Sequence, residues 1–228
     1  MKQIDSLIKV WGSLIWKNDN FYDLVETLED KSKHKNIILT TGSKDISDII
    51  RDRLVDIMES KLSLENHIDI TWKSRDIMSQ AFCDISDKFV PLFDLKEIDT
   101  ILKKDRIPII IQYELLKQLQ PFPLERWLST DTSSAYFSNL VNAETFIKLT
   151  NVDWVYKDIN DNNSLLNEIY TKELKLMWKT CIWTSLADFL DKINSICYVL
   201  NWNNSENLKM FLDEWKSVHT KVIPINWF

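Results

Sequence analysis

The sequence predicts an α/β fold in which a mainly parallel β-sheet is covered by helices on both faces. Two observations predict it. Short runs rich in apolar and β-branched residues recur along the chain, and longer amphipathic stretches separate them. Strands that are apolar on both faces are typical of parallel sheets, because the helices that connect such strands bury both sides of the sheet.

Seven segments have the composition of buried strands. Two examples are NIILTT (36–41) and IPIII (107–111), which are short and bounded by polar residues. The expected strands, in chain order, are 5–11, 36–41, 89–93, 107–111, 145–150, 195–200 and 220–225.

Amphipathic patterns between these strands predict nine helices. A proline-containing stretch, LQPFPLERW (119–127), interrupts them and is the expected boundary between an N-terminal lobe, 1–120, and a C-terminal lobe, 121–228. The expected helices are 19–33, 45–60, 65–82, 95–104, 112–119, 132–142, 164–176, 185–193 and 204–215.

Charge and cysteine content exclude several classes of protein. The formal net charge is -6 with the two signs interspersed, and no basic stripe indicates nucleic-acid binding. Cys83, Cys181 and Cys197 have neither metal-binding nor disulfide-framework spacing, which fits a reducing cytoplasm. No apolar run approaches the length of a membrane span. We therefore expect a cytoplasmic protein that acts on a small molecule, without a nucleic-acid or membrane partner and without a bound metal.

Three strand ends carry residues suited to a ligand, and ligands of parallel sheets bind beyond the carboxyl ends of strands. A helix start at STDTSSAYF (129–137) adds hydroxyl groups and one carboxylate. The residues at the strand ends are Lys9 with Gly12 and Ser13, Thr40 and Thr41 with Gly42 and Ser43, and Thr150 with Asn151 and Asp153.

These residues suit phosphoryl transfer. Lys9 would neutralise charge on the transferring phosphoryl group, and Asp131 would orient it. Each also has a structural interpretation: Lys9 as a solvated strand end, Asp131 as a plain helix cap, and TTGS (40–43) as an ordinary turn. We interpret the histidines, His34, His67 and His219, as structural or surface residues.

Taken in order, the segments resemble the amino acid kinase family, which includes aspartate, acetylglutamate and uridylate kinases. IKVWGSL (8–14) resembles the family's opening KxGGS turn, and the segment 129–156 resembles its DxxA…LTxVDGVY motif. VLNWNNSENLKMFL (199–212) is similar to a later strand and helix. The approach to Asp131 resembles the small archaeal-type members, which are uridylate-kinase-like proteins or aminomethylfuran phosphate kinases.

The resemblance implies a three-layer α/β/α sandwich and transfer of the γ-phosphoryl of ATP, with Mg²⁺ carried by the nucleotide. The N-terminal lobe would hold the acceptor and the C-terminal lobe the nucleotide, and the protein would form a homo-oligomer. Lys9 and Asp131 would be catalytic. The remaining implied residues are Trp11 (a family glycine position), Gly12 and Ser13 for phosphate; Gly42 and Ser43 for the acceptor; and Thr150, Asn151, Asp153, Trp154 (a family glycine position), Tyr156 and Lys179 for the nucleotide. The family's second catalytic lysine lies in the later C-terminal part, where Lys175 and Lys179 are the candidates.

The departures from the family follow a pattern. Tryptophan stands at three family glycine positions, 11, 154 and 202, and glycine would also suit 178 and 215, whereas Trp127 matches a tryptophan of the small members. The chain has 2 glycines and 10 tryptophans, where average usage of about 7% gives roughly 16 glycines. We hypothesise that the gene reads UGA as glycine and that these tryptophans result from translation with another code. If the tryptophans are real, the alternative is a pseudokinase or an oxyanion storage protein of the same fold.

Overall fold

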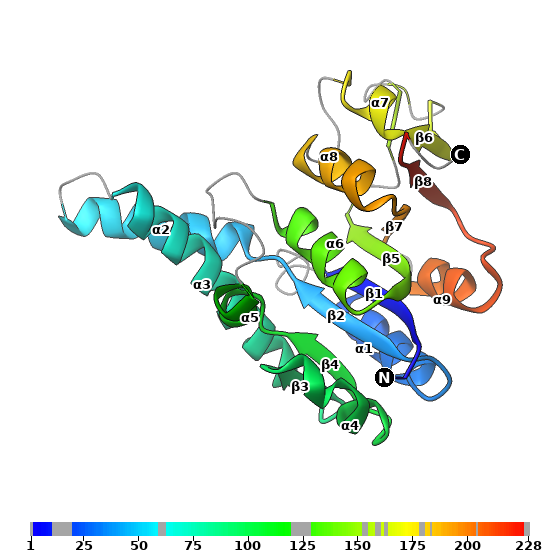
Figure 1. Ribbon diagram of the computed structural model, residues 1–228, viewed down its shortest axis with the longest axis horizontal. Helices are drawn as coiled ribbons and strands as arrows, with labels where there is room; N and C mark the ends of the chain where they lie inside the picture. Colours follow the sequence, from blue (N-terminus) through cyan, green and yellow to red (C-terminus); the bar gives the residue numbers. More distant parts are fainter. Residues whose placement is uncertain are drawn as a thin grey trace.

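A computed structural model describes residues 2–10, 20–58, 63–119, 129–151, 155–157, 161, 164–177, 181–182, 184–203 and 205–225. Within these ranges eight strands form one sheet, in the order β3-β4-β2-β1-β5-β7-β8-β6 (Figure 1). The strands are β1 (Ile4–Val10), β2 (Ile37–Thr41), β3 (Phe89–Leu92), β4 (Ile107–Ile110), β5 (Ala143–Thr150), β6 (Glu168–Tyr170), β7 (Cys197–Asn201) and β8 (His219–Ile223).

The sheet is mainly parallel, as the sequence predicts. All neighbours from β3 to β7 run parallel, β8 runs antiparallel to β7, and β6 is parallel to β8. Every residue of β2 and β4 is buried, which explains why these strands are apolar on both faces. The sheet is continuous between the two halves of the chain, because β1 pairs with β2 on one side and with β5 on the other. The expected lobe boundary lies mostly in residues 120–128, outside the described residues, so the division into lobes stays a prediction.

Helices cover both faces of this sheet (Figure 1). The helices are α1 (Asn20–Lys31), α2 (Lys44–Met58), α3 (Leu64–Cys83), α4 (Ile98–Leu102), α5 (Gln112–Leu119), α6 (Thr130–Leu140), α7 (Thr171–Leu174), α8 (Thr184–Ile193) and α9 (Ser205–Glu214), with a 3-10 turn at Leu95–Glu97 before α4. None of these described helices is long and apolar enough to cross a membrane.

Two apolar clusters, one on each face, hold the layers together. Successive residues of β1 alternate between them: Leu7 packs in the cluster that contains α5, α6 and α8, and Ile8 packs in the cluster that contains α1 and α9. This alternation places Lys9 on the same face as Leu7. The three-layer arrangement that the family resemblance implies is therefore confirmed.

One predicted element is wrong. The sequence pattern predicts a helix over 164–176, but the structure has the short edge strand β6 followed by the single turn α7. In β6 only Ile169 is buried, and its neighbours Glu168 and Tyr170 face solvent. Pairing with β8 imposes this alternation, and three residues are too few to display it against the helix-forming composition around them.

Candidate functional site

The register of three neighbouring strands builds the centre of the candidate site. In β1, Lys9 lies opposite Thr40 of β2 on one side and opposite Lys148 of β5 on the other. Residues paired in register point to the same face of a sheet. The three side chains consequently form a row beneath the first turns of α6.

The first turn of α6 packs directly against this row of side chains. Ser129 caps the helix, because its hydroxyl accepts a hydrogen bond from the Thr132 N–H at 3.1 Å. Ser133 and Ser134 are fully buried, and such small side chains let the helix approach the sheet closely. Thr40 Oγ1 donates to Ser134 Oγ at 2.8 Å, which ties α6 to β2.

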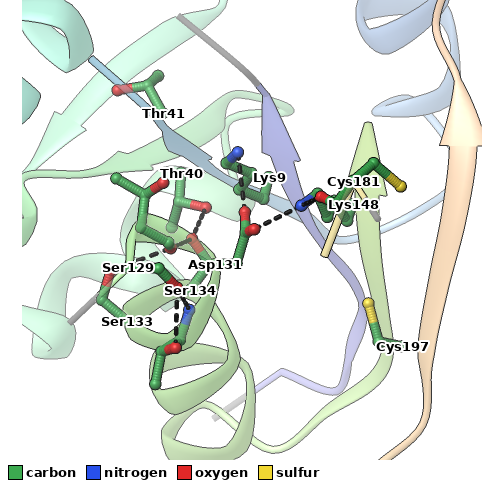
Figure 2. Close-up of polar contacts among 12 residues, drawn as sticks. Lys9, Thr40, Thr41, Ser129, Asp131, Ser133, Ser134, Lys148, Cys181 and Cys197 are labelled. Carbon is green, nitrogen blue, oxygen red and sulfur yellow. Dashed lines mark hydrogen bonds and ion pairs between the residues drawn. The ribbon is translucent and has the colours of Figure 1, made fainter. Parts of the chain in front are cut away.

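Asp131, in that turn, is held between the two lysines (Figure 2). Its Oδ1 lies 2.9 Å from the Lys9 Nζ, and its Oδ2 accepts a hydrogen bond from the Lys148 Nζ. The Lys148 Nζ also donates to the backbone carbonyl of Cys181. All three ionised side chains are almost completely buried, with 2–3% of their surface exposed. Lys9 and Asp131, predicted from the sequence as a pair, are thus brought together.

The pKa values of the three groups follow from burial and from one another. Burial alone would raise the pKa of Asp131, but the ammonium groups of Lys148 and Lys9 outweigh it and hold this pKa well below its usual range. Burial lowers the pKa of Lys9, and the charges of Lys148 and Arg75 lower it further, against the opposing effect of Asp131. For Lys148 burial also acts to lower the pKa, but Asp131 outweighs it, so this pKa is raised. The carboxylate therefore stays ionised at neutral pH.

Lys148 is not among the residues that the sequence predicts for the site. A signal for it exists: it is a lysine within the apolar run FIKL (146–149) of a strand, and buried lysines need a charged partner. Lys175, a candidate for the second catalytic lysine, lies elsewhere and pairs with Asp188 and Asp191, at 2.7 Å from each. Lys179, the other candidate, lies outside the described residues.

The predicted acceptor turn, Gly42 and Ser43, is buried at the carboxyl end of β2. The Gly42 N–H donates to the Val10 carbonyl at 2.9 Å, and the Ser43 hydroxyl lies 2.9 Å from the hydroxyl of Ser74 in α3. Two further hydrogen bonds connect this region to α6, from Gln112 Nε2 to the Thr41 carbonyl and from Ser133 Oγ to Gln112 Oε1, at 2.6 and 2.7 Å.

On the predicted nucleotide side, Thr150 ends β5. Its hydroxyl is buried and has no hydrogen-bond partner within the described ranges. A buried hydroxyl without a partner costs about 1–3 kcal/mol, so this position suits a ligand that supplies one. Asn151 is exposed next to it, and the half-buried Tyr156 pairs with Leu165 in an isolated antiparallel bridge.

Several predicted residues, namely Trp11, Gly12, Ser13, Asp153 and Trp154, lie outside the described residues. Trp202 directly follows β7 and is buried among apolar residues of α9 and β-strands, and its backbone N–H donates to the Thr150 carbonyl at 3.1 Å. In the part of the chain that the structure describes, no three His, Cys, Asp or Glu side chains group to hold a metal ion.

Comparisons with known proteins agree with this geometry. The chain is 22% identical, over 96% of its length and 98% of the relative's, to [5-(aminomethyl)furan-3-yl]methyl phosphate kinase of Methanocaldococcus jannaschii. Its fold is similar to uridylate kinase from Archaeoglobus fulgidus (TM-score 0.74, 14% identity, 96% of this chain and 100% of that one). It is also similar to UMP kinase from Ureaplasma parvum (TM-score 0.71, 15% identity, 97% and 100%). The model of the amino acid kinase family matches residues 6–187. The chain belongs to the amino acid kinase family.

Proposed function

We propose that this protein is an ATP-dependent kinase that transfers the γ-phosphoryl group to a carboxylate or phosphate oxygen of a small metabolite. The observation that carries the proposal is the buried cluster of Lys9, Asp131 and Lys148. Two ammonium groups share one carboxylate in it. The cluster therefore has an excess positive charge that a phosphoryl group can neutralise.

Each member of the cluster has a role in this reaction. Lys9 would contact the transferring phosphoryl group at the end of β1, where charge develops in the transition state. Asp131 would position both ammonium groups from the start of α6. Lys148 would hold the second carboxylate oxygen, so that Asp131 cannot rotate away from Lys9. ATP would bring its own Mg²⁺, and Thr150 would offer its hydroxyl to the nucleotide in the C-terminal lobe.

The electrostatics of Asp131 restrict the acceptor. A carboxylate whose pKa is held low by two ammonium groups is a weak base. An alcohol acceptor would need a base to remove its proton, whereas carboxylates and phosphates are already ionised at neutral pH. The named activities of the relatives, the furan phosphate kinase and the uridylate kinases, support an acceptor of this kind. We expect direct in-line transfer to such an acceptor, without a covalent intermediate.

The test combines ATP binding with transfer. Thermal unfolding is measured with and without ATP and Mg²⁺, since a ligand at 100 times its Kd adds about 2.7 kcal/mol of stability. Labelled ATP is then supplied with uridylate, the aminomethylfuran phosphate, aspartate and N-acetylglutamate. We expect transfer to one of them, and Lys9→Met should reduce the rate about 100- to 1000-fold. Lys33→Met is the control, because Lys33 is exposed and pairs only with the surface carboxylate of Asp30 among the contacts described for it.

The outcomes separate the alternatives. Stabilisation by ATP without transfer to any acceptor would favour the pseudokinase, and binding of oxyanions without ATP would favour the storage protein. If ATP does not stabilise the protein and no acceptor is phosphorylated, the kinase proposal is contradicted. The same preparation, examined by sedimentation, tests the homo-oligomer that the family resemblance implies.

A further inference from the structure

A third buried cation, Arg75, lies at the same centre. It is in the middle of α3 and only 3% of its surface is exposed. Its positive charge acts on both Lys9 and Asp131. Burial lowers the pKa of Arg75 to about 9, so the guanidinium stays charged at neutral pH. The proposed phosphoryl site is therefore flanked by a second kind of cation, on the side of α3.

The backbone around Arg75 is fixed at the carboxyl ends of β2 and β4. Thr41 Oγ1 lies 2.8 Å from Ser79 Oγ, and Ser79 Oγ donates to the Ile110 carbonyl at 3.2 Å. Asp76 accepts a hydrogen bond from the Tyr113 N–H at 2.9 Å. These contacts tie α3 to two strands and to α5, close to Arg75 in the sequence.

Arg75 also neighbours the predicted acceptor turn. The residue before it, Ser74, contacts Ser43 of that turn through their hydroxyl groups, 2.9 Å apart. Lys9 and the turn lie at the ends of adjacent parallel strands, β1 and β2. The guanidinium is thus on the acceptor side of the lysine rather than on the side of Thr150.

An aromatic ring lies against the guanidinium. Its Cζ lies 3.5 Å from the centre of the Trp72 ring, and this ring is fully buried. This is a cation–π contact, which stabilises a guanidinium in a buried position. A guanidinium carries five N–H donors in one plane, a fork that can bind two oxygens of one anion.

We propose that Arg75 binds the phosphate group of the acceptor, and that the acceptor is therefore a phosphate monoester rather than a carboxylate. This inference rests on the proposed kinase function. The planar fork of arginine matches two oxygens of a phosphate, and a buried guanidinium is costly to retain where an apolar side chain would pack equally well. A phosphate dianion also brings two negative charges to a centre where Lys9, Lys148 and Arg75 surround Asp131.

The chemical step balances without a base. An oxygen of the acceptor phosphate attacks the γ-phosphorus of ATP and forms a new P–O bond. The bond from the γ-phosphorus to the bridging oxygen breaks, and ADP leaves with the electron pair. No proton needs removal, because the second pKa of a phosphate monoester is about 6. The product is a diphosphate ester.

The test uses Arg75→Gln, which removes the charge, and Arg75→Lys, which keeps it without the fork. Lys73→Gln is the matched control, since Lys73 is on the same helix but is exposed and pairs with Asp69 on the surface. Turnover is measured with two phosphate monoesters, uridylate and the aminomethylfuran phosphate, and with two carboxylates, aspartate and N-acetylglutamate. We expect wild-type transfer to a monoester. The KM for that monoester should rise about 10- to 100-fold in Arg75→Gln and less in Arg75→Lys. The KM for ATP should stay within about twofold of the wild-type value in both.

Three results would overturn the inference while leaving the kinase proposal intact: transfer to a carboxylate only, an unchanged monoester KM in Arg75→Gln, or an equal rise in the KM for ATP. The wild-type panel decides the acceptor class even if a variant fails to fold. If no acceptor is phosphorylated, the kinase proposal fails. Calorimetric titration with uridylate in the absence of ATP then tests whether Arg75 binds a phosphate monoester. Weaker uridylate binding in Arg75→Gln than in Lys73→Gln would support it. Equal binding, or no binding to the wild-type protein, would overturn it.

Discussion

Replacing Asp131 with asparagine should destabilise the protein more than replacing either lysine that contacts it. The Asp131→Asn variant would leave two ammonium groups side by side on neighbouring strands, both with about 2% of their surface exposed and without their shared carboxylate. Removing one partner of a buried ion pair costs about 3–5 kcal/mol, and here two pairs lose the same partner. Lys148→Met or Lys9→Met, in contrast, leaves one ammonium facing one carboxylate.

The expected loss for Asp131→Asn is therefore about 3–5 kcal/mol, a large share of the roughly 5–15 kcal/mol that stabilises an ordinary domain. Each lysine-to-methionine variant should lose less, because a neutral pair remains and methionine fills a similar volume. The measurement is urea unfolding at pH 7, followed by intrinsic fluorescence. Asp30→Asn is the control: its carboxylate pairs with Lys33 at 3.1 Å on the surface, where such a pair contributes about 0–1 kcal/mol.

The pH dependence of the stability of the Asp131→Asn variant tests whether the charge left in the cluster is positive. Without the carboxylate, burial lowers the pKa values of both lysines in the folded protein relative to the unfolded one. The unfolded state then binds more protons, so the stability of the variant should recover as the pH rises from 7 towards about 10. A loss no larger than that of Lys148→Met, or a variant that weakens further as the pH rises, would refute the reasoning that this cluster holds an excess positive charge.

Four further outcomes follow from single residues. Burial raises the pKa of Asp76 from 3.8 to about 6. The contribution of the protonated Asp76 carboxyl to folding stability is therefore fully present below pH 3.8 and is lost as the pH rises through about 6. Over this range the free energy of unfolding of the wild type should fall relative to that of Asp76→Asn, by at most about 3 kcal/mol. Trp215 has a φ of 59° immediately after α9, in the left-handed region that favours glycine. The Trp215→Gly variant should therefore be about 1 kcal/mol more stable than Trp215→Ala, and equal stabilities would contradict this. As the control within the helix, Glu214→Gly should be less stable than Glu214→Ala. Thr150→Val removes a buried hydroxyl that has no partner in the described ranges, so the stability of the variant should equal that of the wild type or be slightly higher. The KM for ATP should rise about fivefold, and an unchanged KM would exclude Thr150 from the nucleotide site. Sequencing the source DNA should show TGA at positions 11, 154, 202 and 215 and TGG at position 127, whereas TGG at all five would make the tryptophans real.

The sheet could be predicted from the sequence because its strands are apolar on both faces. The expected strands 36–41 and 107–111 correspond to β2 and β4, which differ from them by one residue at an end and are buried throughout. The edge strand β6 could not be predicted in the same way. Only one of its residues is buried, and its pairing with β8, far along the chain, decides its conformation.

The candidate site shows a similar limit. Lys9 and Asp131 stand at a strand end and a helix start, two positions that sequence patterns can locate. Lys148 belongs to the site because β1 and β5 pair in a register that places it beside Lys9. Arg75 belongs to it because α3 is tied to the ends of β2 and β4. Both depend on contacts between segments distant in sequence, which a single sequence does not show.

One tryptophan bears on the hypothesis that glycine is the native residue. Trp215 has a backbone conformation that glycine adopts more readily. This conformation carries a penalty that glycine would not, which favours glycine at position 215. The cluster of Lys9, Asp131 and Lys148 supports a protein that still binds phosphate, because an excess buried charge destabilises a protein unless an anion binds to it. A member of this fold that had lost phosphate binding could replace one of the two lysines at a small cost in stability, because a neutral pair would remain, and this chain retains both.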